Sequence, residues 1–298
     1  MPKIVVVGSI NMDLVVLTSR YPEIGETLTG EGFMTFAGGK GANQAVAASR
    51  LGSSVVMLGC VGNDAFGREL SARLLNEGVD TAWVDVIEEV ETGVAAITVA
   101  GGDNAIVVIP GANHRLSEAH VQAAERVIRD ADVVLSQLEV PMPTVLAAAR
   151  MARKHGKPFI LNPAPASALP DALYSSIDLL VPNETEATLL TGITVRDPAS
   201  AEEAARSLLA RGVRSVLITL GANGVAVIDD AGERHLPAHV VKAVDTTAAG
   251  DTFIGGLTAG LVEGMAMDEA VALGQRASAL CVTRHGAQPS IPYRREIA

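Results

Sequence analysis

The sequence predicts an α/β protein with a doubly wound, mostly parallel central sheet flanked by helices, and with a small β-sheet lid inserted. Three observations support this fold class. Short apolar runs alternate with helical segments along most of the chain. Hydrophobic residues make up 48% and aromatic residues only 3% of the 298 residues, so Val, Ala, Leu and Ile must fill a core of buried parallel strands. Two strand-like segments interrupt the alternation.

The N-terminal half is expected to supply the first strands and helices of the sheet. A β-branched run that ends at Gly8 is typical of a buried central strand. An Ala-rich segment favours a helix, and Phe66, Leu70 and Leu74 share one face of the next helix. In order, we expect a strand over 4–7, a helix over 41–51, a strand over 54–58 and a helix over 64–76.

The C-terminal half continues the pattern. Ser117 is a typical N-cap residue, and Pro143 is well placed at the start of a helix. Short apolar runs between these helices favour parallel strands. The expected elements are a helix over 117–129, a strand over 133–135, a helix over 145–154, strands over 159–161 and 179–181, a helix over 201–210 and a strand over 215–219.

Residues of about 14–36 and 93–110 do not suit the main sheet. The first segment alternates polar and apolar residues around Pro22 and Gly25, and the second predicts a hairpin. Its strands, 94–99 and 105–109, would be joined through 101–104. We expect both segments to form one small sheet, a lid that excludes water from a site beneath it. No linker is evident, so residues 1–298 are expected to form a single domain.

Charge and composition exclude several function classes. The formal net charge is -11 and no basic cluster is present, so nucleic acid is not an expected partner. No apolar run is long enough to span a membrane and no signal-peptide pattern precedes the first strand, so a cytoplasmic enzyme is expected. Cys60 and Cys281 both lie in apolar runs; free buried thiols are expected, and their pairing stays open.

The motif over 245–253 carries the most chemistry. It combines two carboxylates, small residues and Gly250 just before an apolar run. A helix that begins near Gly250 would present free N–H groups and a positive dipole end, which suits phosphate. Asp251 at its first turn is placed to take a proton from an attacking hydroxyl. A plain helix N-cap would also explain Asp and Thr here, but the full string beside the other motifs favours phosphoryl transfer to an alcohol.

Three further motifs offer polar groups for a polyhydroxyl ligand. Asn11 and Asp13 follow the first strand, where ligands bind in such sheets, although both residue types also favour turns. The paired glycines of 37–45 permit close backbone approach and precede Lys40 and Asn43; a glycine turn before a helix is the structural alternative. Glu139 follows another strand, where a surface carboxylate is the common explanation.

Two other turns suit a nucleotide. Asn183 and Glu186 follow a strand and could position phosphates and the water shell of Mg²⁺, although Asn183 is also a typical helix cap. The glycine-rich turn over 219–224 separates two strand-like runs and could line a nucleotide site or be a hairpin turn. Neither the dinucleotide-binding fingerprint nor a Walker A loop is present.

Together these motifs resemble the ribokinase-like carbohydrate kinase family. The resemblance runs from Val6 to about Pro292 and is most specific over 38–45 and 245–253. The supporting matches are Gly8-Ser9-Ile10-Asn11-Met12-Asp13, Leu161-Asn162-Pro163-Ala164-Pro165, Pro182-Asn183-Glu184-Thr185-Glu186 and Thr283-Arg284-His285-Gly286-Ala287-Gln288-Pro289-Ser290.

The resemblance implies ATP-dependent phosphorylation of the 5-hydroxyl of D-ribose, with Asp251 as general base. Ala248, Ala249 and Gly250 would form the anion hole for the transferred phosphoryl group. The residues implied to bind the sugar are Asn11, Met12, Asp13, Gly39, Lys40, Gly41, Ala42, Asn43, Glu139 and Asp251. The residues implied to line the site for ATP are Asn183, Glu186, Thr219, Leu220, Gly221, Ala222, Asn223, Gly224, Gly250 and Gln275, with Glu186 near phosphate and Mg²⁺.

The resemblance also implies an activating K⁺ ion and a homodimer in which the lid sheets pair. The ion would order the loop that shapes the anion hole. The residues that match its site, mostly through backbone or hydroxyl oxygens, are Asp245, Thr247, Cys281, Arg284, Gly286 and Ser290.

Two departures from the family pattern bear on specificity. Met12 stands where relatives often carry a smaller residue, which could favour 2-deoxyribose, and Gln275 replaces a His or Asn near adenine. A kinase for 2-deoxyribose or another small sugar is therefore the alternative within the family. A sugar-binding regulator without catalysis is the alternative in another class, and the presence of Asp251 with the glycine-rich anion hole argues against it.

Overall fold

The computed structural model describes residues 3–297, in which the main sheet has nine strands. Their spatial order is β13-β12-β11-β10-β9-β8-β1-β4-β5. All neighbours from β11 to β5 pair in parallel, and β12 and β13 add antiparallel strands at one edge. The strands are β1 (Lys3–Val7), β4 (Ser54–Gly62), β5 (Val79–Ile87), β8 (Val133–Ser136), β9 (Phe159–Leu161), β10 (Leu179–Leu180), β11 (Ser215–Thr219), β12 (Val225–Asp229) and β13 (Gly232–Leu236).

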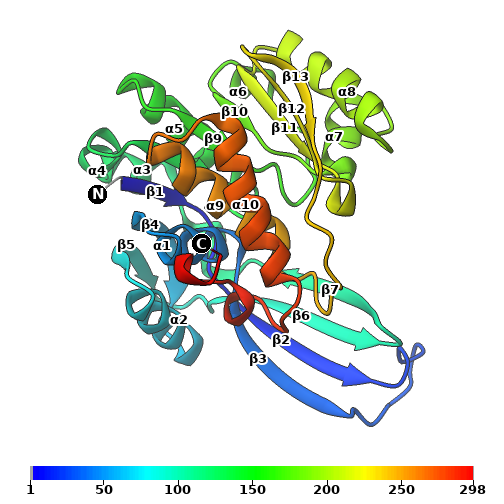
Figure 1. The fold of residues 1–298 in the computed structure, drawn as a ribbon. Coiled ribbons are helices and arrows are strands. Elements are labelled where there is room, and N and C mark those ends of the chain that lie inside the picture. Colours follow the sequence, from blue (N-terminus) through cyan, green and yellow to red (C-terminus); the bar gives the residue numbers. More distant parts are fainter. Residues whose placement is uncertain (1–2, 298) are drawn as a thin grey trace.

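Helices cover both faces of this sheet (Figure 1). Alternate side chains of β1 point to opposite faces, and each face has its own apolar core: Val5 and Val7 lie in one, Ile4 and Val6 in the other. The helices over the Val5 face are α3 (Glu118–Ala123), α4 (Glu125–Arg129), α5 (Met142–Lys154), α6 (Asp171–Tyr174), α7 (Glu184–Thr191) and α8 (Pro198–Ala210). Those over the Ile4 face are α1 (Lys40–Arg50), α2 (Ala65–Asn76), α9 (Ala249–Val262) and α10 (Met267–Cys281). The predicted fold class is confirmed.

The two lid segments form one separate sheet, as expected. Its order is β3-β2-β6-β7, with β2 and β6 parallel and the other pairs antiparallel. The sheet extends away from the main body in Figure 1. Its strands are β2 (Asn11–Thr18), β3 (Gly32–Gly38), β6 (Gly93–Ala100) and β7 (Asp103–Ile109). Because β2 begins at Asn11, residues 11–13 belong to a lid strand and not to a turn after β1.

Two local expectations need correction, and two strands had not been expected. The β6–β7 turn is only Gly101-Gly102, since Ala100 pairs with Asp103, and both glycines have positive φ. The helix expected over 117–129 is broken at Ala124 into α3 and α4. The edge strands β5 and β13 were not expected, because neither forms an apolar run: Asp80 and Asp85 interrupt β5, and the sequence of β13 is Gly-Glu-Arg-His-Leu.

Candidate active site

The polar motifs meet at the carboxyl ends of the parallel strands of the main sheet. Ser9 follows β1, Glu139 follows β8, Asn162 follows β9 and Asn183 follows β10. Carboxyl ends of parallel strands form the ligand-binding edge of such sheets. The N-termini of α1 and α9 lie together at this end of the strands, because Asn43 and Gln44 near the start of α1 donate hydrogen bonds to Asp251 in the first turn of α9.

Glu139 is the centre of a cluster built by three segments. One carboxylate oxygen, Oε2, accepts hydrogen bonds from Ser9 Oγ at 2.5 Å, Lys40 N at 3.0 Å and Asn11 Nδ2 at 3.5 Å. Glu139 is therefore not a free surface carboxylate. It joins the loop after β8 to the N-terminus of α1 and to the first lid strand.

Sequence reasoning missed Asn113, which is 1% exposed and orients Asn11. Its Nδ2 donates to Asn11 Oδ1 at 2.6 Å, and its Oδ1 accepts from Ile10 N at 2.9 Å. With its oxygen occupied, the Asn11 amide presents its N–H groups to Glu139 and to any ligand beside it. Asn113 lies in a short 3₁₀ segment after β7, so no local motif points to it.

Met12 lies on the opposite side of β2 from Asn11 and Asp13, because side chains alternate along a strand. It is 1% exposed and belongs to the apolar core together with Ile10 and Ala37. The Met12 side chain therefore packs in the core and not in the polar cluster. Its position does not support the expectation that its bulk selects a less hydroxylated sugar.

The charges of four carboxylates, including that of Asp13, act on Lys40. Burial, followed by the negative charges of Glu139 and Asp251, raises the pKa of Asp13 to about 7, against the opposing charge of Lys40. Burial acts to lower the pKa of Lys40, but Asp251, Glu139, Glu186 and Asp13 together hold it above its ordinary value. Lys40 is thus a cation, the charge expected of a group that binds hydroxyl or phosphate oxygens.

We expect the raised pKa of Asp13 to appear in the pH dependence of catalysis. If ionised Asp13 accepts sugar hydroxyls, kcat/KM for the sugar falls below about pH 7 by up to tenfold per unit, since this ratio reports groups of the free enzyme. Asp13→Asn should remove that limb; an unchanged limb would contradict the assignment.

The same shift lowers the free energy of unfolding as pH rises from about 4 to 7, because the folded state holds the proton more tightly.

Glycines allow the segments around this cluster to approach closely. A Cβ at Gly38 would lie 2.3 Å from an Asp13 carboxylate oxygen, and one at Gly41 would lie 2.6 Å from Ser9 N. Gly39 has φ 87° and also packs on the backbone of Asn11. The neighbouring Ala42 N donates to Ser9 O at 2.9 Å. Residues 38–42 thus allow the start of α1 to pack closely against the loop after β1 and against the lid.

The N-terminus of α9 has the geometry expected for an anion hole. Ala248 adopts a left-handed conformation with φ 58°, and the helix begins at Ala249. The first turn of a helix leaves backbone N–H groups without intrahelical partners. Asp251 lies in this turn, and its two oxygens accept hydrogen bonds from α1: Oδ2 from Asn43 Nδ2 and Oδ1 from Gln44 Nε2, both at 2.9 Å.

A cavity of about 410 Å³ adjoins this helix end, since Ala249 and Gly250 line it. Of the residues expected to bind nucleotide, it is lined by Thr219, Gly221, Ala222, Gly224, Gly250 and Gln275. Leu220 and Asn223 belong to the same turn but do not line the cavity, and Leu220 is buried. Sequence reasoning missed its apolar walls, which include Val240, Val241 and Phe253. A cavity with apolar walls suits a nucleobase.

Asn183 and Glu186 lie outside that cavity and bind each other. Asn183 caps α7, and the Glu186 carboxylate accepts from Asn183 N at 2.9 Å and Asn183 Nδ2 at 3.0 Å. Burial raises the pKa of Glu186, and the charges of Lys40 and Asp251 also act on this carboxylate. Since both oxygens are already bonded, the pair fits a hydrated Mg²⁺ better than a directly bound one.

The residues expected to hold a monovalent cation also lie together. Asp245 accepts from Thr247 N and Gly286 N, both at 2.9 Å. Burial acts to raise its pKa, but these hydrogen bonds hold it below the ordinary value. Cys281 Sγ lies 3.0 Å from Ser290 Oγ and 3.8 Å from Thr247 O. Carboxylate, hydroxyl and carbonyl oxygens suit a hard cation. The Arg284 guanidinium pairs with Glu296 instead, which leaves only its backbone for such a role.

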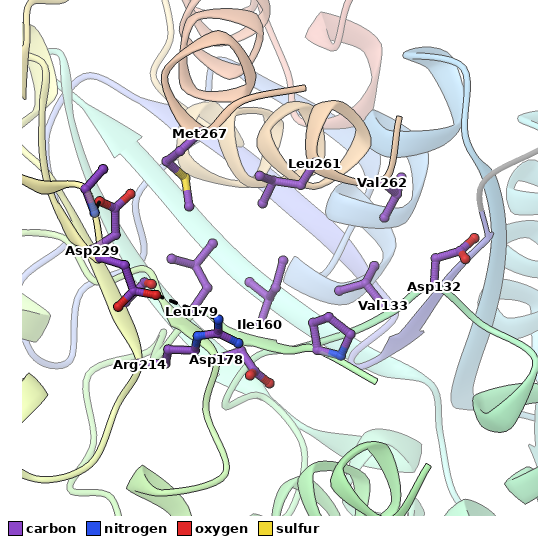
Figure 2. Close-up of a pocket in the computed structure, with 14 residues that line it drawn as sticks. Asp132, Val133, Ile160, Asp178, Leu179, Arg214, Asp229, Leu261, Val262 and Met267 are labelled. Atoms are coloured by element: carbon purple, nitrogen blue, oxygen red, sulfur yellow. Dashed lines mark hydrogen bonds and ion pairs between the residues drawn. The ribbon is translucent and has the colours of Figure 1, made fainter. Parts of the chain in front are cut away.

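A second cavity, of about 550 Å³, lies at the amino ends of the parallel strands, away from the polar cluster. Figure 2 shows Val133, Ile160 and Leu179, from the starts of β8, β9 and β10, among its carboxylates. Those carboxylates are already bonded: Asp178 accepts from Phe159 N at 2.8 Å and Asp229 pairs with an arginine, Arg234. None of the expected site residues lines this cavity, so it is not the candidate active site.

These features together define a phosphotransferase site. They are a nucleotide-sized cavity, a helix N-terminus and a buried carboxylate beside a polar cluster. The model of the pfkB family of carbohydrate kinases matches residues 1–294. The chain belongs to this family.

Individual relatives agree with this assignment. The chain is 47% identical over 292 residues to a ribokinase of Haemophilus influenzae, covering 98% of this chain and 95% of the relative. It is 39% identical to a deoxyribokinase of Salmonella typhi over 97% of this chain and 95% of the relative. A solved structure of Arabidopsis thaliana ribokinase complexed with ribose and ATP matches with TM-score 0.92 and 34% identity, covering 99% and 97% of the two chains.

Proposed function

We propose that this protein is a kinase that transfers the γ-phosphoryl group of ATP to the 5-hydroxyl of D-ribose. The observation that carries the proposal is the position of Asp251. It lies in the first turn of α9, whose Ala249 and Gly250 line the nucleotide-sized cavity, while its carboxylate binds Asn43 of α1 on the side of the polar cluster. The identity to curated ribokinases over nearly the whole chain supports the choice of sugar.

The proposed roles follow from this geometry. The O–H bond of the 5-hydroxyl breaks, its proton passes to the Asp251 carboxylate, and the sugar oxygen bonds to the γ-phosphorus as the bond to the ADP oxygen breaks. The helix start at Ala248, Ala249 and Gly250 stabilises the negative charge on the transferred phosphoryl group. A hydrated Mg²⁺ near Glu186 would neutralise phosphate charge when bound. Asn11, Asp13, Lys40 and Glu139 orient the sugar.

A kinase for 2-deoxyribose is the second candidate. The identity to deoxyribokinases supports it, whereas the core position of Met12 removes the sequence argument for it. A non-catalytic sugar-binding regulator would not require a carboxylate held by two amides beside a helix N-terminus.

We also propose that K⁺ activates the enzyme. The ion would bind among Asp245, Thr247 and Ser290 and order the loop that leads into α9. We expect KCl to stimulate turnover and raise the melting temperature more than NaCl at equal ionic strength. Asp245→Asn should lose this difference. Equal rates and equal melting temperatures in the two salts would contradict the cation site.

A homodimer through the lid is proposed from the exposure of its apolar residues. Phe33 is 63% and Val107 64% exposed, and every residue of the edge strand β7 is exposed. Such edges and patches are usually covered. Sedimentation should give twice the chain mass, and Phe33→Glu with Val107→Glu should give the monomer. A monomeric wild-type protein at micromolar concentration would contradict this.

The part of the chain that the structure describes has no helix suited to crossing a membrane; cell fractionation would test the expected cytoplasmic location.

A further inference from the structure

A buried chain of amides connects the general base proposed above to the middle of the sheet. Gln44 and Gln137 are both 0% exposed. Gln44 Nε2 donates to Asp251 Oδ1 at 2.9 Å and to Asn162 Oδ1 at 3.1 Å, and its Oε1 accepts from Gln137 Nε2 at 2.6 Å. Four polar side chains from four separate segments thus form one network beneath the site.

The network has one permitted orientation. Asn162 is fixed because its Nδ2 donates to Val181 O at 3.0 Å, so its oxygen faces Gln44. If the Gln44 amide were reversed, its oxygen would face the oxygens of Asn162 and Asp251, which is repulsive. Gln44 must therefore turn its oxygen to Gln137, and Gln137 must present its N–H group.

This orientation leaves a buried acceptor unused. Gln137 Oε1 has no hydrogen-bond partner among the described residues, an arrangement that typically costs stability. Space is also reserved for it, since a Cβ at Gly8 would lie 2.1 Å from this oxygen. The oxygen of Gln137 thus stays unpaired, and the same arrangement fixes Gln44 Nε2 as a hydrogen-bond donor to Asp251.

The two oxygens of Asp251 have different partners. Oδ1 is held by Gln44, which is buried beneath the site and bonded on both sides. Oδ2 is held by Asn43, which lies one helical turn after Lys40 and whose own Oδ1 has no partner in the described structure. Asn43 can therefore exchange partners when a hydroxyl arrives, whereas Gln44 cannot.

We infer that Gln44 is a positioning residue, which anchors Asp251 through Oδ1 so that Oδ2 accepts the proton of the sugar hydroxyl, and that Gln137 fixes the orientation of Gln44. The inference rests on the proposed function, because it assigns Asp251 the role of base. Breaking the anchor lets the carboxylate rotate away from the hydroxyl, so it lowers kcat and leaves sugar binding to Asp13, Lys40 and Glu139 in place.

The test is a double-mutant cycle between Gln44 and Asp251. Gln44→Met, which is similar in length but cannot donate, should lower kcat by about 10–100-fold, as expected for a lost hydrogen bond to a charged group. KM for the sugar should stay within about threefold. In the Asp251→Asn background the same change should lower kcat less than about twofold. Gln137→Met should show the same dependence on Asp251 with a smaller effect, and exposed Gln122→Met is the matched control.

Additive losses in the cycle, or a raised KM with unchanged kcat, would overturn the inference, because Gln44 would then act on packing or sugar binding. Melting temperatures show which variants are folded, and Gln137→Met carries the cycle if Gln44→Met does not fold. The assay uses whichever sugar the wild type phosphorylates. A lack of turnover with D-ribose alone therefore counts against the proposed function and not against the role of Gln44.

Discussion

The Asp251→Asn variant is expected to bind the sugar with nearly unchanged affinity and to lose turnover by about 10²–10⁴-fold, the usual contribution of a general base. Asparagine keeps the shape of the side chain and can still contact Asn43 and Gln44, but it cannot take the hydroxyl proton. Calorimetric titration with sugar and steady-state turnover with ATP-Mg²⁺ measure the two effects separately.

The matched control for this variant is Asp230→Asn, which changes an exposed carboxylate at the opposite edge of the sheet. We expect near wild-type turnover from it. Turnover of Asp251→Asn within about threefold of wild type would contradict the assignment of the base, and equal losses in both variants would indicate a general effect of charge.

The Gly38→Ala variant is expected to lower kcat/KM for the sugar by at least about 100-fold. A methyl group there would lie 2.3–2.5 Å from the carboxylate atoms of Asp13, so Asp13 or the end of β3 must move, and a misplacement of about 1 Å can cost 10²-fold. Steady-state kinetics over a range of sugar concentrations measures the loss. In the same lid, Gly30→Ala places its methyl group no closer than 3.4 Å to a neighbour, and near wild-type values are expected.

An equal loss in the two glycine variants would mean that the lid, and not the Asp13 contact, is sensitive. A normal kcat/KM in Gly38→Ala would mean that Asp13 does not bind the sugar in the observed position.

The fold class and the main motifs could be predicted from the sequence because they are local signals. Apolar runs mark the buried strands, and the glycine-rich strings mark the starts of α1 and α9. The strand β5 could not be predicted in this way, since an edge strand with Asp80 and Asp85 has no apolar run.

The support for the site could not be predicted, because it depends on contacts between distant segments. Asn113 orients Asn11 across 102 positions of the chain, and Gln44 contacts Asp251 across 207. The core position of Met12 could not be predicted for a related reason. Residues 11–13 were expected in a loop after the first strand, whereas in strand β2 the middle side chain must point away from its neighbours.

The most direct test of the account is steady-state phosphorylation by ATP-Mg²⁺ in the presence of K⁺, with D-ribose, 2-deoxy-D-ribose, D-fructose and adenosine compared by kcat/KM. The account predicts a clear preference for D-ribose and a product phosphorylated at the 5-position. A preference for 2-deoxyribose would keep the mechanism and replace the substrate. Absence of turnover with all four would contradict the proposed function.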